Sequence, residues 1–484
     1  MSLLQSLRGA PASVAVLVML TACGGGGGGT PDSSAPTSGA QSVSVISSGT
    51  ITGFGSVYVN GVRYDTSSSS FTINGQPGTQ SQLRVGQVIK VEAHRDGGGN
   101  SFADRITFDD LVKGPVTSVD AATGQLVVLG QTVVTDADTS FDDNIPTTSL
   151  TGLVVGDIVE ISGWRRADGS IQATRVERKP AGTLFEVFGI ASQVDTNAHK
   201  LNVNALVVNY STATLQNFPN GQPSNGVLVE AKGSSINAAG ELVASSLELK
   251  RADDNGGAGM QVEIEGLVTR FVAASDFDVA GKPVTTNSTT QYEGGAAGDL
   301  RLNVKVEVEG SMNSAGVLVA SKVQFKRQAS TRIEARVDSV DRAANKLVVL
   351  GIDVTVNATT RLEDKSDARA PNFNLGDIAA GDFVEVRGAE LPAESNDVVA
   401  SRLERRKADA DLRVRGVVDS VTRPSLSILG VTIQTDASTQ FEDSADARIT
   451  ADAFFNAAAG RNVSAKGMLN GGVFIARELE FEND

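Results

Sequence analysis

Hydrophobic and polar residues alternate along much of the chain, and the alternating stretches are short. Between Asn303 and Gly310, for example, every second residue is a valine and the residues between are lysine or glutamate. A period of two over a few residues predicts a β-strand with one buried face. Turn-forming residues separate these stretches, as in the Ala-Asp-Gly-Ser segment at 167–170, so we expect strands joined by tight turns.

The segment 112–180 shows the alternation five times. The expected strands are 112–119, 126–129, 132–135, 158–164 and 171–178. The longest connection lies between the third and fourth strands, and near the C-terminus the matching connection includes an alanine-rich stretch, 451–459, that predicts a short helix. Five strands with a helix between the third and fourth are typical of an OB-like barrel, whose closure also removes exposed strand edges. A small β-sandwich of the same strands is the alternative.

This segment is one of six similar copies. The fourth strand of the copies ends in a recurring glycine, at positions 163, 233, 310, 388 and 467, and the first copy has Ala93 there. The intervals are 70, 70, 77, 78 and 79 residues (163 − 93, 233 − 163, 310 − 233, 388 − 310, 467 − 388). A fixed order of landmarks at a near-constant period predicts a tandem array. The expected copies are 47–111, 112–180, 181–251, 260–327, 330–407 and 410–484, and the fourth departs most from the pattern.

The N-terminal segment predicts export. Arg8 precedes an apolar run at 12–20, and Leu-Thr-Ala-Cys follows, ending at Cys23. This order is typical of a secretory signal, and the last four residues resemble the lipobox of bacterial lipoproteins. The resemblance implies that 1–22 are removed, that Cys23 is acylated, and that Gly24 directs the protein to the outer membrane. An ordinary secretory signal is the alternative. Glycine, serine and proline at 23–46 predict a disordered, flexible tether.

Composition narrows the function classes. The net charge is −15, which disfavours nucleic-acid partners, and an aromatic content of 5% disfavours stacking on single-stranded bases. Cys23 is the only cysteine, so disulfides and thiolate metal sites are not expected. The two histidines, His94 and His199, lie in different copies without a metal-binding or triad spacing. We therefore expect no cofactor and no catalytic residues.

Three residue groups remain as candidate sites. Carboxylates cluster in the loops after the third strands and suggest weak calcium sites, with solvated connections as the alternative; they are Asp142, Asp143, Glu363, Asp364, Asp367, Glu442, Asp443 and Asp446. Trp164, next to Arg165 and Arg166 on a polar face, suggests contact with a sugar or a protein, with packing against another copy as the alternative. Outward charges such as Arg402 and Glu404 predict exposed cross-strand ion pairs, each contributing about 0–1 kcal/mol.

The opening of the first copy carries a family resemblance. Residues 53–66 read GFGSVYVNGVRYDT, and later copies repeat the pattern G-D-x-V-E-V-x-G followed by A-S-R-L-E. From about residue 48 to the end, the chain resembles proteobacterial lipoproteins that are built from the domain of unknown function 5666. The resemblance supplies no activity and no site residues. We expect an outer-membrane, lipid-anchored scaffold or adhesion protein that binds protein or polysaccharide; the alternative is an envelope enzyme that uses carboxylates on glycans.

Overall fold

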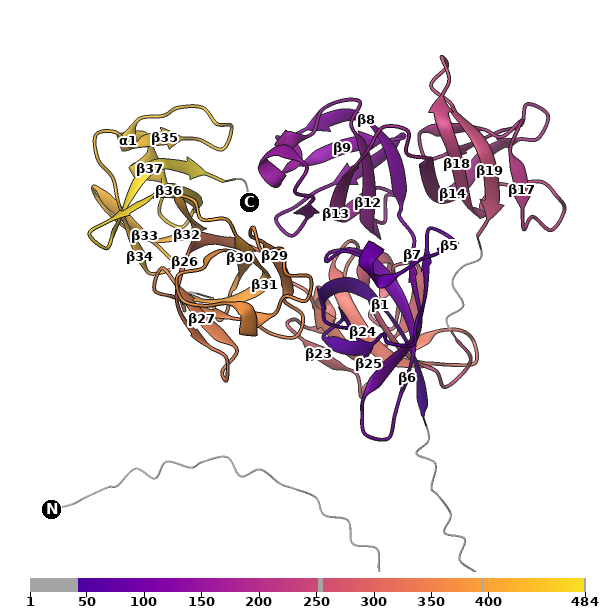
Figure 1. The fold of residues 1–484 in the computed structure, drawn as a ribbon, viewed down its shortest axis with the longest axis horizontal. Coiled ribbons are helices and arrows are strands. Elements are labelled where there is room, and N and C mark those ends of the chain that lie inside the picture. Colours follow the sequence, from indigo (N-terminus) through magenta and orange to yellow (C-terminus); the bar gives the residue numbers. More distant parts are fainter. Residues whose placement is uncertain (1–41, 251–255, 394, 483–484) are drawn as a thin grey trace, which may run out of the picture. The chain divides into compact units, whose positions relative to one another are not determined.

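The computed structural model describes residues 42–250, 256–393 and 395–482. Within these ranges the protein is almost entirely β-structure, with one α-helix, α1 (Ala451–Ala457), and a few short 3-10 turns (Figure 1). None of the helices in the described ranges is long and apolar enough to cross a membrane. The expected signal segment, Cys23 and most of the expected tether lie outside the described residues.

The second copy folds as a closed five-stranded barrel. Its strands are β8 (Val112–Asp120), β9 (Gln125–Val128), β10 (Gln131–Val134), β12 (Ile158–Arg165) and β13 (Ile171–Lys179). The first strand pairs with the second and the fourth, and the third pairs in parallel with the fifth, so the ring closes in the order 1-2-3-5-4. The OB-like barrel is thereby confirmed against the sandwich alternative.

One strand of this barrel was missed in the sequence. Ser140 and Phe141 form β11, which pairs in parallel with β13 beside the third strand. A segment of two residues is too short to show a period of two. The expected helix between the third and fourth strands is confirmed as α1 in the last barrel, whereas the second barrel has only 3-10 turns there, at Pro146–Thr148 and Leu150–Gly152.

Inward side chains fill each barrel, as the alternation predicts. In the second barrel Val159 and Ile161 point inward from β12, Val176 points inward from β13, and all three are fully buried. The fourth and fifth strands form a long hairpin whose other face points away from the core. The first strand is kinked by a register shift between Val116 and Ser118, which lets one half pair with β9 and the other with β12.

The barrels are joined in pairs through their first strands. Three sheets result, of 13, 12 and 12 strands. In the first sheet β1 (Val43–Phe54) of barrel 1 pairs in parallel with β20 (Gln261–Ala273) of barrel 4. In the other two sheets the first strands are antiparallel and join barrels 2 and 3, and barrels 5 and 6. Because β1 begins at Val43, the last residues of the expected 23–46 tether belong to barrel 1 instead.

The remaining strands can be followed in Figure 1. Barrel 1 adds β2 (Val57–Val59), β3 (Val62–Asp65), β4 (Ser70–Ile73), β5 (Gln76–Pro77), β6 (Val88–Arg95) and β7 (Ser101–Phe108). Barrel 3 consists of β14 (Phe185–Asp195), β15 (Lys200–Val203), β16 (Leu206–Asn209), β17 (Thr214–Gln216), β18 (Leu228–Ile236) and β19 (Leu242–Leu249). Barrel 4 adds β21 (Asp276–Val279), β22 (Lys282–Thr285), β23 (Gln291–Glu293), β24 (Lys305–Met312) and β25 (Leu318–Phe325).

The third sheet has the same element order twice. Barrel 5 consists of β26 (Thr331–Asp341), β27 (Lys346–Val349), β28 (Ile352–Thr355), β29 (Arg361–Lys365), β30 (Phe383–Glu390) and β31 (Asp397–Arg406). Barrel 6 consists of β32 (Leu412–Thr422), β33 (Ser425–Ile428), β34 (Val431–Gln434), β35 (Gln440–Glu442), β36 (Asn462–Asn470) and β37 (Val473–Phe481).

The recurring glycine lies within the fourth strands, shortly before their ends, and has a steric cause. At each of the five positions the ladder between the fourth and fifth strands shifts register, so the two main chains come unusually close. A Cβ atom built on Gly163, Gly310 or Gly388 would lie only 2.1–2.2 Å from a carbonyl oxygen of the fifth strand. At these glycines a side chain would therefore collide with the neighbouring strand, whereas barrel 1 has the same register shift and accommodates Ala93.

Candidate functional site: the charged faces between barrels

Charged side chains gather on the outward face of the fourth and fifth strands, which we call the outer face of a barrel. In barrel 5 this face carries Glu385 from β30 and Arg402 and Glu404 from β31. These side chains point away from the barrel core, as expected, but they are buried: Glu385 and Glu404 are 0% exposed and Arg402 is 3% exposed. The expectation of solvent-exposed ion pairs is therefore wrong, because another part of the chain covers this face.

Glu385 is the centre of the barrel 5 face. Its carboxylate lies 2.5 Å from Arg387 Nε, 2.9 Å from Arg406 Nη1, 3.0 Å from Arg332 Nη2 and 3.2 Å from Arg402 Nη2. Burial alone would raise the pKa of this carboxyl group, but the four guanidinium groups outweigh burial and hold the pKa well below its usual value. The carboxylate is thus ionised and tightly paired.

Barrel 2 supplies the cover for this face. The segment at its β11 strand presents main-chain carbonyl groups to three arginines of barrel 5. Arg387 donates to Ala137 O at 2.6 Å, Arg361 to Asp138 O at 2.6 Å and Arg402 to Thr139 O at 3.1 Å. Guanidinium groups have enough donors to serve a carboxylate and a carbonyl at once. The arginines therefore join the two barrels.

Asp138 fixes the same contact through its side chain. Its carboxylate accepts hydrogen bonds from Ser401 Oγ at 2.7 Å and from Ala329 N at 3.1 Å. Burial would raise its pKa, but the Arg361 charge and the hydrogen bond from Ser401 lower it on balance. Asp138 is one of the residues that sequence reasoning missed. The sequence did contain a possible signal, because two aspartates, Asp136 and Asp138, precede the missed strand β11.

Barrel 2 has a similar outer face, which barrel 1 covers. Arg175 donates to Val85 O at 3.0 Å and also to Glu177 Oε1 at 2.7 Å. Glu177 accepts a second bond from Gln87 at 3.1 Å, and Val88 N donates to Ser162 Oγ at 2.8 Å. Two outer faces of the chain are therefore closed by a main-chain segment of another barrel.

Buried acids also line the seam between barrels 2 and 3. Lys113 Nζ lies 2.8 Å from Asp110 and 2.6 Å from Glu186, and Lys232 lies 2.6 Å from the other oxygen of Glu186. Burial, together with the neighbouring charge of Glu186, raises the pKa of Glu230 to about 7. At neutral pH the lysines of this seam therefore do not keep every buried carboxyl group ionised.

The structure places Trp164 inside the protein. The residue is 5% exposed, its indole N–H has no hydrogen-bond partner among the residues that the structure describes, and its strand β12 contacts β20 of barrel 4. Arg165 donates to Phe188 O and lies 5.6 Å above the Phe188 ring, and Arg166 donates to Gln172 at 3.0 Å. The three side chains do not form an open binding surface, and the packing alternative accounts for the burial of the tryptophan.

The acidic loops of barrels 2 and 5 lie side by side, and their carboxylates pair with arginine and lysine side chains. Asp142 and Glu363 lie 3.7 and 3.9 Å from Arg175, and Asp143 lies 3.8 Å from Lys365 and pairs with Arg369. Basic groups thus already neutralise these carboxylates.

The other acidic residues serve their own loops. Asp364 binds Arg405 through both oxygens, at 2.6 and 3.1 Å, and Asp367 pairs with Lys407 at 2.5 Å. Asp443 accepts from the amides of Ala445 and Ala447, Asp446 lies within that turn, and Glu442 precedes it. In the described ranges none of these loops brings three carboxylates together. The calcium hypothesis for these loops therefore stays a prediction, and the contacts above favour the alternative of plain connections.

A comparison with models of protein families identifies the family of this chain. The model of the DUF5666 family, a domain of unknown function, matches residues 45–107, 113–177, 265–324, 334–404 and 415–480. Together these stretches make up more than half of the chain. The protein belongs to the DUF5666 family. No curated protein matches the sequence.

The DUF5666 matches fall on barrels 1, 2, 4, 5 and 6. Barrel 3 lies outside them, although its strands follow the same order as those of its neighbours. The fourth copy, which the sequence pattern set apart, is matched, so that expectation is corrected. Within barrel 3 the fifth strand has Ser246 where barrels 2 and 5 have Arg175 and Arg402, so this barrel lacks the outer-face arginine.

Proposed function

We propose that this DUF5666 protein is a lipid-anchored, non-catalytic protein of the cell envelope, held at the outer membrane through Cys23, and that it binds envelope polysaccharide. Repetition supports a binding role, because an enzyme needs one site whereas repeated modules suit a scaffold. The outer faces are used to join barrels, so ligand contact is expected at surfaces that remain open. The membrane anchor rests on the sequence pattern around Cys23.

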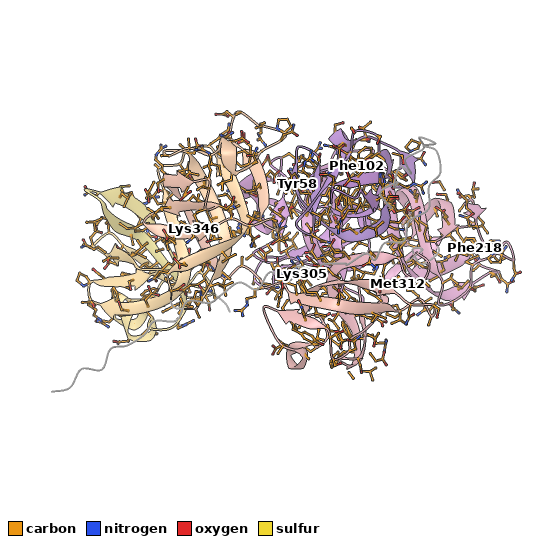
Figure 2. All side chains as sticks on the ribbon, turned by 90° about the horizontal axis from the view of Figure 1, so that it is seen from below. Tyr58, Phe102, Phe218, Lys305, Met312 and Lys346 are labelled. Atoms are coloured by element: carbon orange, nitrogen blue, oxygen red, sulfur yellow. The ribbon has the colours of Figure 1, made fainter. Side chains whose placement is uncertain are left out.

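A cleft on barrel 1 carries the proposal of a polysaccharide ligand. It has a volume of about 500 Å³ and is lined by side chains of β3 and of the β6–β7 hairpin, namely Arg63, Asp65, Arg95, Asn100 and Phe102. Phe102, labelled in Figure 2, stacks on His94 with 5.4 Å between ring centroids. An aromatic ring with amide, carboxylate and guanidinium groups around it suits a sugar, and two arginines favour a saccharide that carries acidic groups.

The anchor and the ligand need separate tests. Wild-type protein and a Cys23→Ser variant are expressed in the native host, and membrane partition is compared. We expect the wild type in the outer-membrane fraction with the mass of an acylated chain, and the variant in the soluble fraction. Equal partition of the two proteins refutes the anchor.

The ligand is tested on a glycan array with purified full-length protein. Arg63→Ala should abolish binding to acidic glycans, whereas Arg105→Ala, a control on β7 whose side chain is 58% exposed, should leave it unchanged. If the array shows no bound glycan and cross-linking in cells captures envelope proteins, the ligand is a protein and the proposal of a polysaccharide ligand is wrong. Hydrolysis of a bound glycan would favour the enzyme alternative.

A further inference from the structure

Three glutamates meet at the junction of barrels 1 and 4. We propose that Glu263, Glu307 and Glu309 bind one divalent metal ion of the calcium class. One carboxylate oxygen from each lies within 4.8 Å of the others. Glu263 comes from β20, and the other two come from β24, whose first and last residues, Lys305 and Met312, are labelled in Figure 2.

Like charges face each other directly in this cluster. Glu263 and Glu309 are opposite partners in the antiparallel ladder between β20 and β24, and Glu307 is two residues from Glu309 along β24, on the same face. Directly opposed like charges destabilise a sheet. Two of the carboxylates are also buried, Glu263 at 8% and Glu307 at 2% exposure, which increases that cost. A positive charge placed among them would remove the repulsion.

Glu263 lacks the cation that its counterparts have. In the described part of the chain it forms no ion pair, and its carboxylate accepts a hydrogen bond from Ser47 Oγ at 3.3 Å. Glu186 stands at the equivalent place in barrel 3, three residues before the glycine of the first strand, and is paired with Lys113 and Lys232. Burial, and then the charges of Glu307 and Glu309, raise the pKa of Glu263 to about 8.

Barrel 1 offers two neutral oxygens beside the glutamates, and these are independent of the acidic cluster. Asn60 is 8% exposed, and its Oδ1 atom has no hydrogen-bond partner. Its Nδ2 atom donates to Ser47 Oγ at 3.1 Å, so the amide is linked to Glu263 through one hydroxyl group. Asn60 also lines, with all three glutamates, a hollow of about 400 Å³. The Asn60 side chain therefore borders the space in which an ion would lie.

Tyr64 is the second buried group. It is fully buried, and its hydroxyl has no hydrogen-bond partner of good geometry. Burial raises its pKa, and the charge of Glu263 raises it further, which places the hydroxyl close to the carboxylates. Carboxylates, amide carbonyls, hydroxyl groups and water are ligands that calcium accepts in six- to eight-fold coordination. The hollow leaves room for the water molecules that complete such a shell.

Two lysines share the cluster and limit the affinity. Lys326 lies 2.8 Å from Glu307, Lys322 pairs with Glu309, and Arg95 lines the same hollow. With Arg95 counted, three basic groups oppose three carboxylates and leave no net negative charge, so we expect a weak site with a dissociation constant of about 10⁻⁴–10⁻³ M, typical of extracellular calcium modules. The oxygen-only donor set favours calcium, magnesium or manganese over zinc. Bound metal would clamp barrel 1 to barrel 4.

The experiment uses purified full-length protein that has been treated with a chelator. Calcium chloride is titrated by calorimetry, and thermal unfolding is followed with and without millimolar calcium. We expect one ion per chain and a higher melting temperature. Glu263→Gln and Glu309→Gln should each weaken calcium binding at least tenfold. Glu92→Gln is the matched control, because Glu92 holds the position of Glu309 in barrel 1, and each side chain is 39% exposed.

A second readout does not depend on the folding of a variant. Terbium replaces calcium in oxygen sites, and its luminescence in the wild-type protein, excited through tyrosine, should rise on binding and fall when calcium is added. Tyr64→Phe should reduce that luminescence and leave the calorimetric affinity within about threefold. No heat and no melting shift at millimolar calcium, magnesium or manganese would refute the site. So would binding that survives Glu263→Gln but disappears in Asp443→Asn.

Discussion

Gly388→Ala in barrel 5 tests whether the fourth and fifth strands approach as closely as the structure shows. The new Cβ would lie 2.2 Å from Val399 O, 2.9 Å from Val399 C and 3.0 Å from the Cα of Ala400, all main-chain atoms of β31. The strands would have to separate by roughly 1 Å to restore ordinary contact. Main-chain atoms cannot rotate away as the end of a side chain can.

The cost follows from two contributions. Inserting a methyl group into a well-packed place costs about 1–3 kcal/mol. Separation of β30 from β31 also weakens ladder hydrogen bonds, at about 1 kcal/mol each. The carbonyl group of Gly388 is held on its other side by Ser330 N at 2.8 Å and Thr331 Oγ1 at 3.1 Å, so the strand is not able to relax outward without further loss. We therefore expect a loss of about 2–4 kcal/mol in barrel 5.

The measurement must resolve one barrel among several, because unfolding of the whole chain need not be two-state. Hydrogen exchange followed by mass spectrometry gives the local opening free energy for peptides from β30 and β31. Ala93→Gly is the control at the same landmark position in barrel 1, with an expected cost of about 0.5–1 kcal/mol. If Gly388→Ala exchanges no faster than the wild-type protein, the close approach is not real, and the recurring glycine needs another explanation.

Three further outcomes follow from the same contacts. Glu385→Gln should lower the free energy of unfolding of barrel 5 by about 3–5 kcal/mol, because four arginines lose a buried carboxylate. An unchanged urea midpoint would contradict this. Glu390→Gln, further along β30, is the control. In metal-free protein, Glu263 has a raised pKa, so its stabilising contribution is complete at acidic pH and is lost as the pH rises through about 8. The wild-type melting temperature should therefore fall between about pH 5 and about pH 8, and fall more than that of Glu263→Gln; parallel profiles would refute the assignment. Trp164, the single tryptophan, should show blue-shifted emission and little quenching by acrylamide, and strong quenching would mean that it is exposed.

Much of the fold follows from local pattern. The five strands of barrel 2 begin and end within one residue of the expected positions, because a period of two and turn residues act over short distances. The helix at 451–457 was recognisable from its alanines. Pairing between barrels was not, since nothing in the order of copies indicates that barrel 1 joins barrel 4 while barrel 2 joins barrel 3.

The candidate sites depended on that missing information. Arg402 and Glu404 are charged, as residues of a solvent-exposed face are, and they are buried only because a neighbouring barrel covers this face. Glu263 and Glu309 are each ordinary members of alternating strands, and their encounter is fixed by strand register, which a sequence pattern does not supply. Trp164 differs from the smaller residues at its position in other copies, but the sequence does not show that it is buried or that β12 contacts β20 of a barrel far along the chain.

The pairing of barrel 1 with barrel 4 also sets an order of events during synthesis. The amide of Thr50 donates to a carboxylate oxygen of Glu265, 215 residues later, so the partner of β1 is made only after barrels 2 and 3, with the first strand of barrel 4. Barrels 2 and 3 are neighbours in the chain and can dock first, because closing a short loop costs less entropy. Meanwhile the unpaired edge of β1 is a template for another nascent chain. Assembly of this protein therefore carries an aggregation risk at its N-terminal barrel, and a chaperone that shields one strand edge would be enough to remove it.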